Sequence, residues 1–514
     1  MKSFTLEEVS KHKSANDIWI AINGNVYDVT NWLIDHPGGR AILLKHGGTD
    51  ASEQFAKFHN PNILNSIGSK FLIGKLGLPQ AIDKEVKPKE ALSFGDGVAF
   101  GDPQWYQGVK SPYYDESHYR LRNCIREFVD KEIMPFAHEW NEQGYLPKDI
   151  YLKFGKAGYL ACISPIPEKY LKYPMPCGLT LKTFDPFHEL VLADELCRCG
   201  SGGVVWGLIG GLPPILHFGS EELKQKVIPE CVSGEKICCL CITEPYAGSD
   251  VANIKTTATL TPDGEHFIVN GEKKWITNGM FADFFTVAVR TGGEGAGGIS
   301  LLLLERSMPG LTTRKINTSG QWCSGTAYIT FENVKVPKSN IIGQINQGFK
   351  VIMYNFNHER VGMAIQCVRF SRVCYEEAFK YSLKRKTFGK LLIQHPVIRQ
   401  KLANMIRQIE SLAVWTESIV YQTKTLSKKE QNLLLGGPTA LLKAHSSFVF
   451  EYCAREAAQI FGGLAFTRGG QAEKVERLYR DVRAYAIPGG SEEIMLDLGA
   501  KQAIKMSQLN GAKL

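Results

Sequence analysis

Two histidines near the start of the chain have the setting of a metal-ligand pair. His36 stands before the turn Pro37-Gly38-Gly39, where glycines let the backbone approach a planar ligand closely. His59 follows 23 residues later, among the aromatic residues of the stretch QFAKFHN. Two imidazoles on opposed short helices in an apolar pocket can supply both axial ligands of a haem iron. An iron ligated in this way has no free position for oxygen or substrate.

A second group of residues has the types that bind a flat cofactor carrying phosphates. The stretch CITEPYAGSDVANI, residues 241–254, ends a predicted strand with a turn whose hydroxyls and backbone N–H groups suit a polar ring or a phosphate. About thirty residues later, NGEKKWITNG places Trp275 and Thr277 on another predicted strand. Indole can stack on the cofactor and the threonine hydroxyl can bond its edge. Taken singly, each stretch is more typical of an ordinary turn and a core tryptophan.

Glu359 is the candidate general base. In the helical pattern VIMYNFNHERVGMAIQCV, Phe356 and Met363 share an apolar face with Glu359, while Arg360 points about 100° away. Desolvation on such a face raises the pKa of a carboxyl from its usual value of about 4.3 towards the range useful for proton abstraction. The alternative is that Glu359 is a structural ion-pair partner of a nearby Arg or Lys.

The elements that must position these residues belong to regions that differ in their predicted secondary structure. Apolar and polar residues alternate around Asn23-Gly24, which predicts a hairpin followed by a short helix. Further along, a Pro-, Gly-, Lys- and Asp-rich segment predicts a linker, and helical, strand-like and again helical patterns follow. The predicted multidomain α+β chain therefore divides into a small domain at 1–76, a linker at 77–114, a helical domain at 115–237, a β domain at 238–345, a helical bundle at 346–508 and a tail at 509–514.

Residues 3–76 resemble the cytochrome b5 family, through Tyr27, the HPGG turn and the second histidine with its aromatic neighbours. The resemblance implies a small α+β domain that holds haem b without covalent attachment, with His36 and His59 as iron ligands. The absence of a C-x-x-C-H motif agrees with this. The alternative, a domain of this fold that has lost haem and binds steroid, needs a replaced ligand, and both ligands are present.

Residues 115–508 resemble the acyl-CoA dehydrogenase family, because the two flavin-type stretches are followed by RKTFG, QIFGGLAF, RLYRDVR and IPGGSEEI in order. The resemblance implies an all-α domain, a β-barrel or sandwich domain and a C-terminal four-helix bundle, with an acyl-CoA substrate. It also implies a homodimer or homotetramer, because the RKTFG and QIFGG residues reach the FAD of a neighbouring subunit. The implied FAD-binding residues are Leu240, Ile242, Thr243, Ser249, Trp275, Ile276, Thr277, Arg385, Phe388, Gln459, Ile460, Phe461, Gly462, Gly463, Ser491 and Glu493.

The position of the base separates this chain from many members of the family that it resembles. Those members carry a glutamate immediately before the Gly-Thr of the C-terminal loop, where this chain has Gly489. A minority, including isovaleryl and long-chain types, carries the glutamate in an E-R pair on a central helix, which here is Glu359-Arg360. The resemblance therefore implies Glu359 as the base and the Gly489 N–H as a donor to the thioester carbonyl. Glu492 and Glu493 are the next candidates, but they begin a predicted helix, where acidic residues complement the dipole. A further departure is Pro396, where many members have a glutamine.

Together, the two resemblances imply a flavohaem enzyme that converts an acyl-CoA to the trans-2-enoyl-CoA. FAD would accept the hydride, and the fused haem or another electron-transfer partner would take the electrons one at a time. Two alternatives stay open. An acyl-CoA oxidase would pass the electrons to oxygen, and a non-catalytic haem carrier would use the dehydrogenase part as a scaffold, a possibility that Gly489 permits.

Composition and charge argue against other classes of protein. The 60 Lys plus Arg against 52 Asp plus Glu give a net charge of +8 without a basic block, so nucleic-acid binding is not expected. The longest apolar stretch, 202–218, is interrupted by Gly and Pro, which argues against a transmembrane segment.

Without a signal or transit pattern, the thirteen cysteines are expected to be reduced intracellular thiols, and Cys238-x-x-Cys241 in its apolar run predicts a buried strand. Ala512-Lys513-Leu514 is a close variant of a peroxisomal address.

Overall fold

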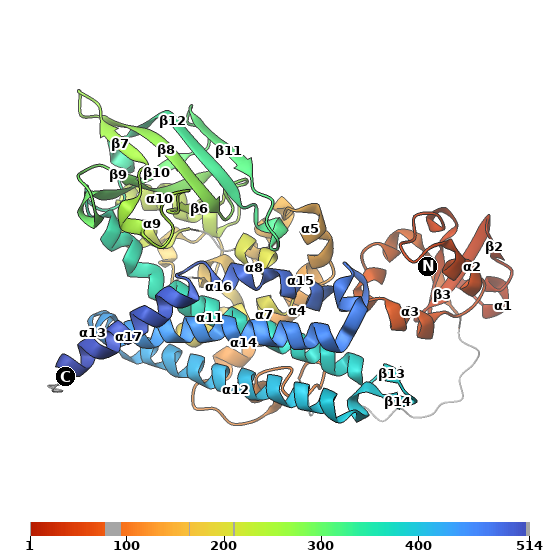
Figure 1. The fold of residues 1–514 in the computed structure, drawn as a ribbon. Coiled ribbons are helices and arrows are strands. Elements are labelled where there is room, and N and C mark those ends of the chain that lie inside the picture. Colours follow the sequence, from red (N-terminus) through yellow and green to blue (C-terminus); the bar gives the residue numbers. More distant parts are fainter. Residues whose placement is uncertain (1, 78–93, 164, 209–210, 510–514) are drawn as a thin grey trace.

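The computed structural model of this protein describes residues 2–77, 94–163, 165–208 and 211–509. The predicted multidomain order is confirmed, with a small N-terminal domain, a helical domain, a β domain and a long-helix domain (Figure 1). Within those four ranges, no helix has both the length and the hydropathy needed to cross a bilayer. The sequence Ala512-Lys513-Leu514 lies outside the described residues.

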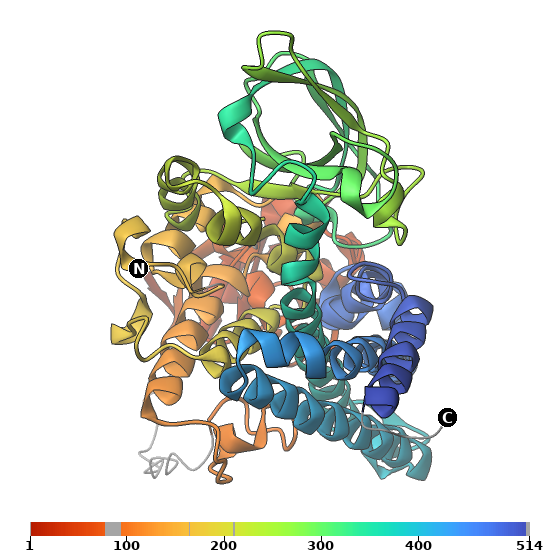
Figure 2. The same ribbon diagram turned by 90° about the vertical axis from the view of Figure 1, so that its left-hand side faces the viewer.

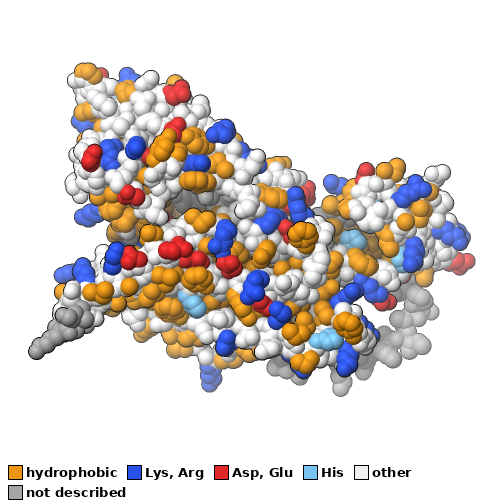
Figure 3. Space-filling model, viewed as in Figure 1, with side chains coloured by type: hydrophobic (Ala, Val, Ile, Leu, Met, Phe, Trp, Pro, Cys, Tyr) orange, Lys and Arg blue, Asp and Glu red, His pale blue; other side chains and the backbone are white. Residues whose placement is uncertain are grey.

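The N-terminal domain is a five-stranded sheet with short helices, and Figure 3 shows it as a separate lobe beside the body. The strand order is β1-β5-β4-β3-β2, with β1 parallel to β5. The predicted hairpin is present at Asn23-Gly24, where both residues have the positive φ of a tight two-residue turn. The elements are β1 (Lys2–Phe4), α1 (Leu6–Val9), β2 (Lys13–Ser14), β3 (Asp17–Ile22), β4 (Asn25–Asp28), α2 (Arg40–His46), α3 (Ser52–Phe58) and β5 (Leu72–Leu76).

The next domain is helical, as predicted, and its core is continuous with that of the two domains that follow. Helix α7 is apolar around much of its surface and is almost entirely buried, so it lies inside the body rather than on it. The helices are α4 (Glu116–Phe128), α5 (Ala137–Gln143), α6 (Lys148–Lys156), α7 (Pro186–Cys197), α8 (Gly202–Leu208), α9 (Pro213–Phe218) and α10 (Glu221–Val232).

The β domain is a seven-stranded sheet that curls into a barrel, seen end-on in Figure 2. The order is β10-β9-β7-β8-β12-β11, and β6 pairs in parallel with β9. Strands β9 and β10 are buried on both faces, which explains their continuous apolar sequences. The strands are β6 (Cys238–Cys241), β7 (Thr257–Leu260), β8 (His266–Ile276), β9 (Phe284–Arg290), β10 (Ile299–Glu305), β11 (Leu311–Lys315) and β12 (Ala327–Pro337).

The C-terminal domain is built on α11, whose 35 residues span about 52 Å. Helices α11, α12, α14 and α17 pack on one another and form the predicted four-helix bundle. A short hairpin, β13–β14, joins α11 to α12. The elements are α11 (Gly348–Ser382), β13 (Lys386–Thr387), β14 (Lys390–Leu391), α12 (Pro396–Thr425), α13 (Lys428–Leu434), α14 (Gly436–Phe461), α15 (Glu473–Asp481), α16 (Arg483–Ala486) and α17 (Glu492–Leu509).

Residues 94–114 pack on the body, so the predicted linker is wrong for this part, and its residues 78–93 lie outside the described residues. Trp105 is buried there, in a short 3-10 helix. Asp102 Oδ1 accepts hydrogen bonds from Arg126 Nη2 at 2.7 Å and from Arg369 Nη1 at 2.8 Å. Although burial opposes ionisation, the two guanidinium groups hold the pKa of Asp102 well below its usual range. This buried ion cluster fastens the segment to α4 and α11.

A disulfide joins Cys124 to Cys177, with Cα atoms 6.7 Å apart. The prediction that all thirteen cysteines are reduced is therefore wrong for this pair. The other eleven are free and buried. Residues Cys238–Cys241 form the buried strand β6, as predicted.

Candidate active site and haem site

Helix α11 presents Glu359 as a half-buried carboxylate. Its Oε1 accepts a hydrogen bond from Nδ2 of Asn355, one helical turn earlier, at 2.9 Å. Burial raises the pKa of Glu359, against the hydrogen bond from Asn355 and the positive charges of His358 and Arg360. The direction of the shift is the one predicted from the sequence. An amide that holds the carboxylate without neutralising it leaves Glu359 available as a base.

The loop before α17 lies against the same turn of α11. Arg360 Nε donates to the carbonyl oxygen of Gly489 at 2.9 Å. Gly489 has a φ of +69°, and a Cβ there would lie 2.9 Å from the Met363 sulfur. A side chain at this position would be strained and crowded. The structure therefore places the loop that carries Gly489 against the turn of α11 that carries Glu359 and Arg360.

Lys443 of α14 holds this loop from the other side. It is fully buried, and its Nζ donates to the carbonyl oxygens of Ala486 at 3.0 Å and Gly490 at 2.6 Å. Burial lowers the pKa of Lys443 to about 8. Of the predicted loop residues, Glu493 is exposed, and the hydrogen bonds from its own backbone and from Ser491 lower its pKa. Glu493 is thus in no position to act as a desolvated base.

The predicted flavin residues of the barrel come together at the ends of β6 and β8. The Lys274 N–H donates to the Thr243 carbonyl oxygen at 2.9 Å, which places the stretch 240–243 beside 275–277. Trp275 has a φ of +58° and leaves half of its side chain exposed, so its indole is free to cover a ring. Ile242 and Ile276 are buried behind it, and Ser249 is exposed on the following turn.

A buried ion pair shapes the turn after β6. Lys273 Nζ lies 2.8 Å from Glu244 Oε1 and also donates to the Ile242 carbonyl at 2.9 Å. The Glu244 carboxylate accepts the backbone N–H groups of Lys255 and Thr256 at 2.5 and 3.0 Å. The carboxylate thus closes the turn that carries Ser249 back onto the strands, which gives the predicted phosphate-binding stretch a fixed shape.

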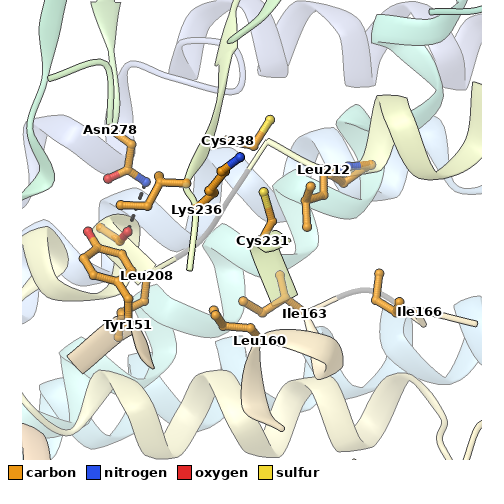
Figure 4. A pocket seen from close by; sticks show the side chains of 13 residues that line it. Tyr151, Leu160, Ile163, Ile166, Leu208, Leu212, Cys231, Lys236, Cys238 and Asn278 are labelled. Atoms are coloured by element: carbon orange, nitrogen blue, oxygen red, sulfur yellow. Dashed lines mark hydrogen bonds between the residues drawn. The ribbon is translucent and has the colours of Figure 1, made fainter. Parts of the chain in front are cut away.

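Beside β6, a partly open pocket of about 40 Å³ lies between the helical domain and the barrel (Figure 4). Its lining includes Leu208, Cys231 and Cys238, and it has room for water. Beside it, Asn278 Nδ2 donates to the Gly207 carbonyl at 3.0 Å. This bond fixes the end of β8 on α8.

The second set of predicted FAD residues lies at the other end of the bundle from the barrel (Figure 1). Tyr381 stacks on Phe461 with ring centroids 4.4 Å apart, which brings the RKTFG hairpin beside the end of α14. Phe388 is almost fully exposed, and Arg385, Gln459, Gly462 and Gly463 are exposed as well. Ile460 and Phe461 are buried in the core, so they present no side chain to a cofactor on this surface. The structure thus collects the exposed members of this set into one surface but does not join them to the barrel set within one chain.

In the N-terminal domain, His36 and His59 face each other with ring centroids 5.8 Å apart. Two metal–nitrogen bonds of about 2 Å, with about 1 Å from each nitrogen to its ring centre, need rings about 6 Å apart. His59 also stacks on Phe55 at 4.6 Å. Burial lowers the pKa of His59, and the neighbouring His36 acts in the same direction. The neutral imidazole that ligates iron is therefore favoured, and the pair fits a haem.

A third cluster has the residue types of a metal site but is already paired. His118 Nδ1 and His188 Nδ1 accept the N–H groups of Asp115 and Asp185, at 3.0 and 3.1 Å. Their Nε2 atoms lie 3.1 Å from Asp185 Oδ1 and 2.9 Å from Ser117 Oγ. Because every ring nitrogen has a partner, we assign the cluster to capping of α4 and α7 rather than to metal binding.

Comparison with known proteins agrees with this geometry. Fungal acyl-CoA dehydrogenases are similar over most of the chain: apdG of Emericella nidulans is 43% identical over 427 residues, with 81% of this chain and 98% of the relative covered. AFT10-1 of Alternaria alternata is 43% identical, with 80% and 97% covered. A solved acyl-CoA dehydrogenase from Geobacillus kaustophilus has 31% identity and a TM-score of 0.69, with 77% and 100% covered. Family matches are the cytochrome b5-like haem/steroid binding domain at 5–77 and the acyl-CoA dehydrogenase N-terminal, middle and C-terminal domains at 115–235, 239–334 and 346–504.

The fold and site define an FAD-dependent oxidoreductase. This chain belongs to the acyl-CoA dehydrogenase family, and an N-terminal cytochrome b5-like domain is fused to it. The residues present fit both cofactors that these families bind. Hydroxyls and an exposed indole at the strand ends suit FAD, and the opposed imidazoles suit haem.

Two residues of the site escaped sequence analysis. Asn355 precedes Glu359 by four residues, so the helical period alone places it beside the carboxylate. Lys443 stands in the apolar run TALLKAHSSFVF, where a lysine facing the core signals a buried acceptor. Both signals were present in the sequence, but the acceptors of Lys443 lie more than forty residues further along the chain.

Proposed function

We propose that this protein removes hydrogen from Cα and Cβ of a fatty acyl-CoA, giving the trans-2-enoyl-CoA, and passes the electrons to its own haem. The observation that carries the first step is the Arg360–Gly489 hydrogen bond, which places the loop that carries Gly489 against the turn of α11 that carries Glu359. When bound, FAD supplies the acceptor for the hydride from the β-carbon.

Each residue of the site has a separate task in this reaction. Glu359 accepts the α-proton at a carboxylate oxygen, because its raised pKa makes it a stronger base than an exposed glutamate. Asn355 holds the other side of that carboxylate in place. The Gly489 N–H faces the charge that develops on the thioester oxygen, and a fixed donor of this kind contributes about 3 kcal/mol. Arg360 and Lys443 hold the loop that carries it.

The Glu359→Gln variant tests the base. We expect it to bind FAD as the wild type does, while acyl-CoA bleaches its flavin at least about 100-fold more slowly in anaerobic stopped flow. The matched control is Glu332→Gln, which changes an exposed glutamate of β12. Wild-type bleaching in Glu359→Gln, or a loss confined to Glu332→Gln, would refute the assignment.

The same experiment tests the acceptor. In the absence of oxygen, the haem of the wild type should turn ferrous after the flavin is bleached. A haem that stays ferric would refute the internal acceptor, and stoichiometric hydrogen peroxide in air would indicate an oxidase instead.

We also propose that the chain is a homo-oligomer. Phe388 and Phe466 leave more than nine-tenths of their side chains exposed, at the end of the bundle where the second set of FAD residues lies. Exposed aromatic side chains of this size are typical of surfaces covered in an assembly. Light scattering tests this: a monomeric wild type would contradict the oligomer, and an unchanged oligomer in the double variant Phe388→Ser and Phe466→Ser would contradict this surface as the interface.

A further inference from the structure

A small contact holds the N-terminal domain on the dehydrogenase body, and it is made by the segment that carries the haem ligand. Asn60, the residue after His59, donates from Nδ2 to Glu473 Oε1 at 3.0 Å. A Cβ built at Gly470 would lie 3.2 Å from the Phe58 carbonyl oxygen, so the two backbones approach closely. Gly470 has a φ of +76°, which favours glycine. The side of the domain that binds haem therefore faces the body.

The body presents Glu473 in a fixed position. Its side chain is mostly buried, although it stands at the start of α15. His138 Nδ1 lies 3.8 Å from its other oxygen. The next residue, Lys474, reaches Glu377 of α11 at 3.3 Å and so ties this end of α15 to the bundle. A carboxylate held in this way forms a ready acceptor for the Asn60 amide.

The segment before Gly470 reaches the barrel. The guanidinium of Arg468 lies over the Trp322 ring at 4.3 Å, and that of Arg480 lies over the same ring at 4.1 Å. Trp322 Nε1 donates to the Thr318 carbonyl at 2.8 Å. Two cation–π contacts and one hydrogen bond thus fix the indole between α15 and the barrel.

On its other side, the Trp322 turn adjoins the predicted flavin residues. The Asn278 N–H donates to the Ser324 carbonyl at 2.8 Å, and Asn278 directly follows Thr277. Along α11, eighteen residues, about 27 Å of helix, separate Glu359 from Glu377, which Lys474 contacts. The contacts of Trp322 give a second connection, which runs from the segment 468–480 to the residue that follows Thr277.

We propose that this contact is the position in which the haem takes electrons from the flavin of its own chain, with Trp322 as a positioning residue between the two. The inference rests on the proposed function. In each step one electron moves from reduced FAD to ferric haem iron, which becomes ferrous, and the flavin's protons pass to solvent. An external one-electron acceptor reoxidises the haem between the two steps.

Variants of the contact test the proposal. Asn60→Ala and Glu473→Gln each weaken a hydrogen bond to a carboxylate, so the docked population should fall about fivefold or more. Asn65→Ala, at an exposed asparagine of the same domain, is the matched control. In anaerobic stopped flow with a saturated acyl-CoA, haem reduction should slow by that factor, while flavin bleaching stays within about twofold of the wild type.

Two substitutions of Trp322 test its role as a positioning residue. Trp322→Leu should slow haem reduction without slowing flavin bleaching, and Trp322→Phe, which keeps a ring between the guanidinium groups, should restore most of the rate. Hydrogen–deuterium exchange of the protein without cofactors gives a second measurement. Asn60→Ala should raise exchange in both 55–60 and 469–475, and Asn65→Ala in neither. Unchanged exchange in those segments would refute the docking contact.

A mixed oligomer separates transfer within a chain from transfer between chains. One chain carries Glu359→Gln and keeps its haem, and the other carries His59→Ala and keeps its base. Transfer within a chain predicts that acyl-CoA bleaches flavin but leaves the haem ferric, and haem reduction in this oligomer would overturn the proposal. Ferric haem in the wild type would instead overturn the proposed function. Normal haem reduction in Asn60→Ala and Glu473→Gln would overturn the docking inference alone.

Discussion

Replacing Lys443 by methionine tests how the Gly489 loop is held. The Lys443 ammonium donates to the carbonyl oxygens of Ala486 and Gly490, and methionine has a similar length but neither charge nor donor. We expect kcat/KM to fall roughly tenfold, about 1.4 kcal/mol, because the Gly489 N–H loses part of its fixed direction. Substrate affinity measured without turnover should change less, since most acyl-CoA contacts remain.

The stability of this variant should depend on pH in a way that the lowered pKa dictates. In the folded protein Lys443 loses its proton near pH 8, whereas the unfolded chain keeps it to about pH 10.4. Between these values the unfolded state binds more protons, so Lys443 makes the wild type more stable as pH rises, by about 3 kcal/mol in total. The Lys443→Met variant lacks this increase in stability. Near pH 7 the variant loses the hydrogen bonds of Lys443, which lowers its stability, but it no longer buries a charge, which raises its stability. The free energies of unfolding of the two proteins should therefore differ by no more than about 2 kcal/mol.

Urea unfolding at a series of pH values from about 7 to about 10, followed by flavin fluorescence, measures this difference. The stability of the wild type relative to Lys443→Met should grow with each step above pH 8. Groups that titrate in both proteins cancel in the comparison, and Lys501→Met, at an exposed lysine, is the control. Parallel curves for the wild type and Lys443→Met would refute the reasoning.

Three further predictions concern substitutions at Asn355, Gly489 and His59. Asn355→Leu removes a hydrogen bond that lowers the pKa of Glu359, so the acid limb of kcat/KM should move to higher pH, and an unmoved limb would count against the contact. Gly489→Ala should cost about 1–3 kcal/mol in urea unfolding, and adding Met363→Ala should recover only the steric part of that loss, because the positive φ remains. His59→Ala should remove the Soret band while acyl-CoA still bleaches the flavin; simultaneous loss of flavin reduction would show that the two sites depend on each other.

Much of the fold could be predicted from the sequence because its signals are local. The Asn23-Gly24 hairpin, the buried strand at Cys238–Cys241 and the long helix around Glu359 each follow from a short pattern. The segment 94–114 could not, because what fixes it is a cluster of distant charges. Asp102 pairs with Arg126 and Arg369, which lie 24 and 267 residues away, and a Pro- and Gly-rich composition conceals that.

The residues of the candidate site also fall into those that a short sequence pattern predicts and those that only the fold brings together. Glu359 was predictable because the helical period places it on an apolar face, and the haem pair because the HPGG turn is specific. The hydrogen bond from Arg360 to Gly489 joins residues 129 apart, so only the folded chain shows that the helix turn that carries Glu359 and the loop meet. The disulfide between Cys124 and Cys177 is likewise a product of packing rather than of spacing.

The anchoring of residues 94–114 on α4 and α11 sets how far the haem lobe could travel. With that segment part of the body, only sixteen residues, 78–93, connect the two. A chain of that length spans no more than about 55 Å when fully stretched. The N-terminal domain therefore stays within about the length of α11, about 52 Å, of the point where residue 94 joins the body.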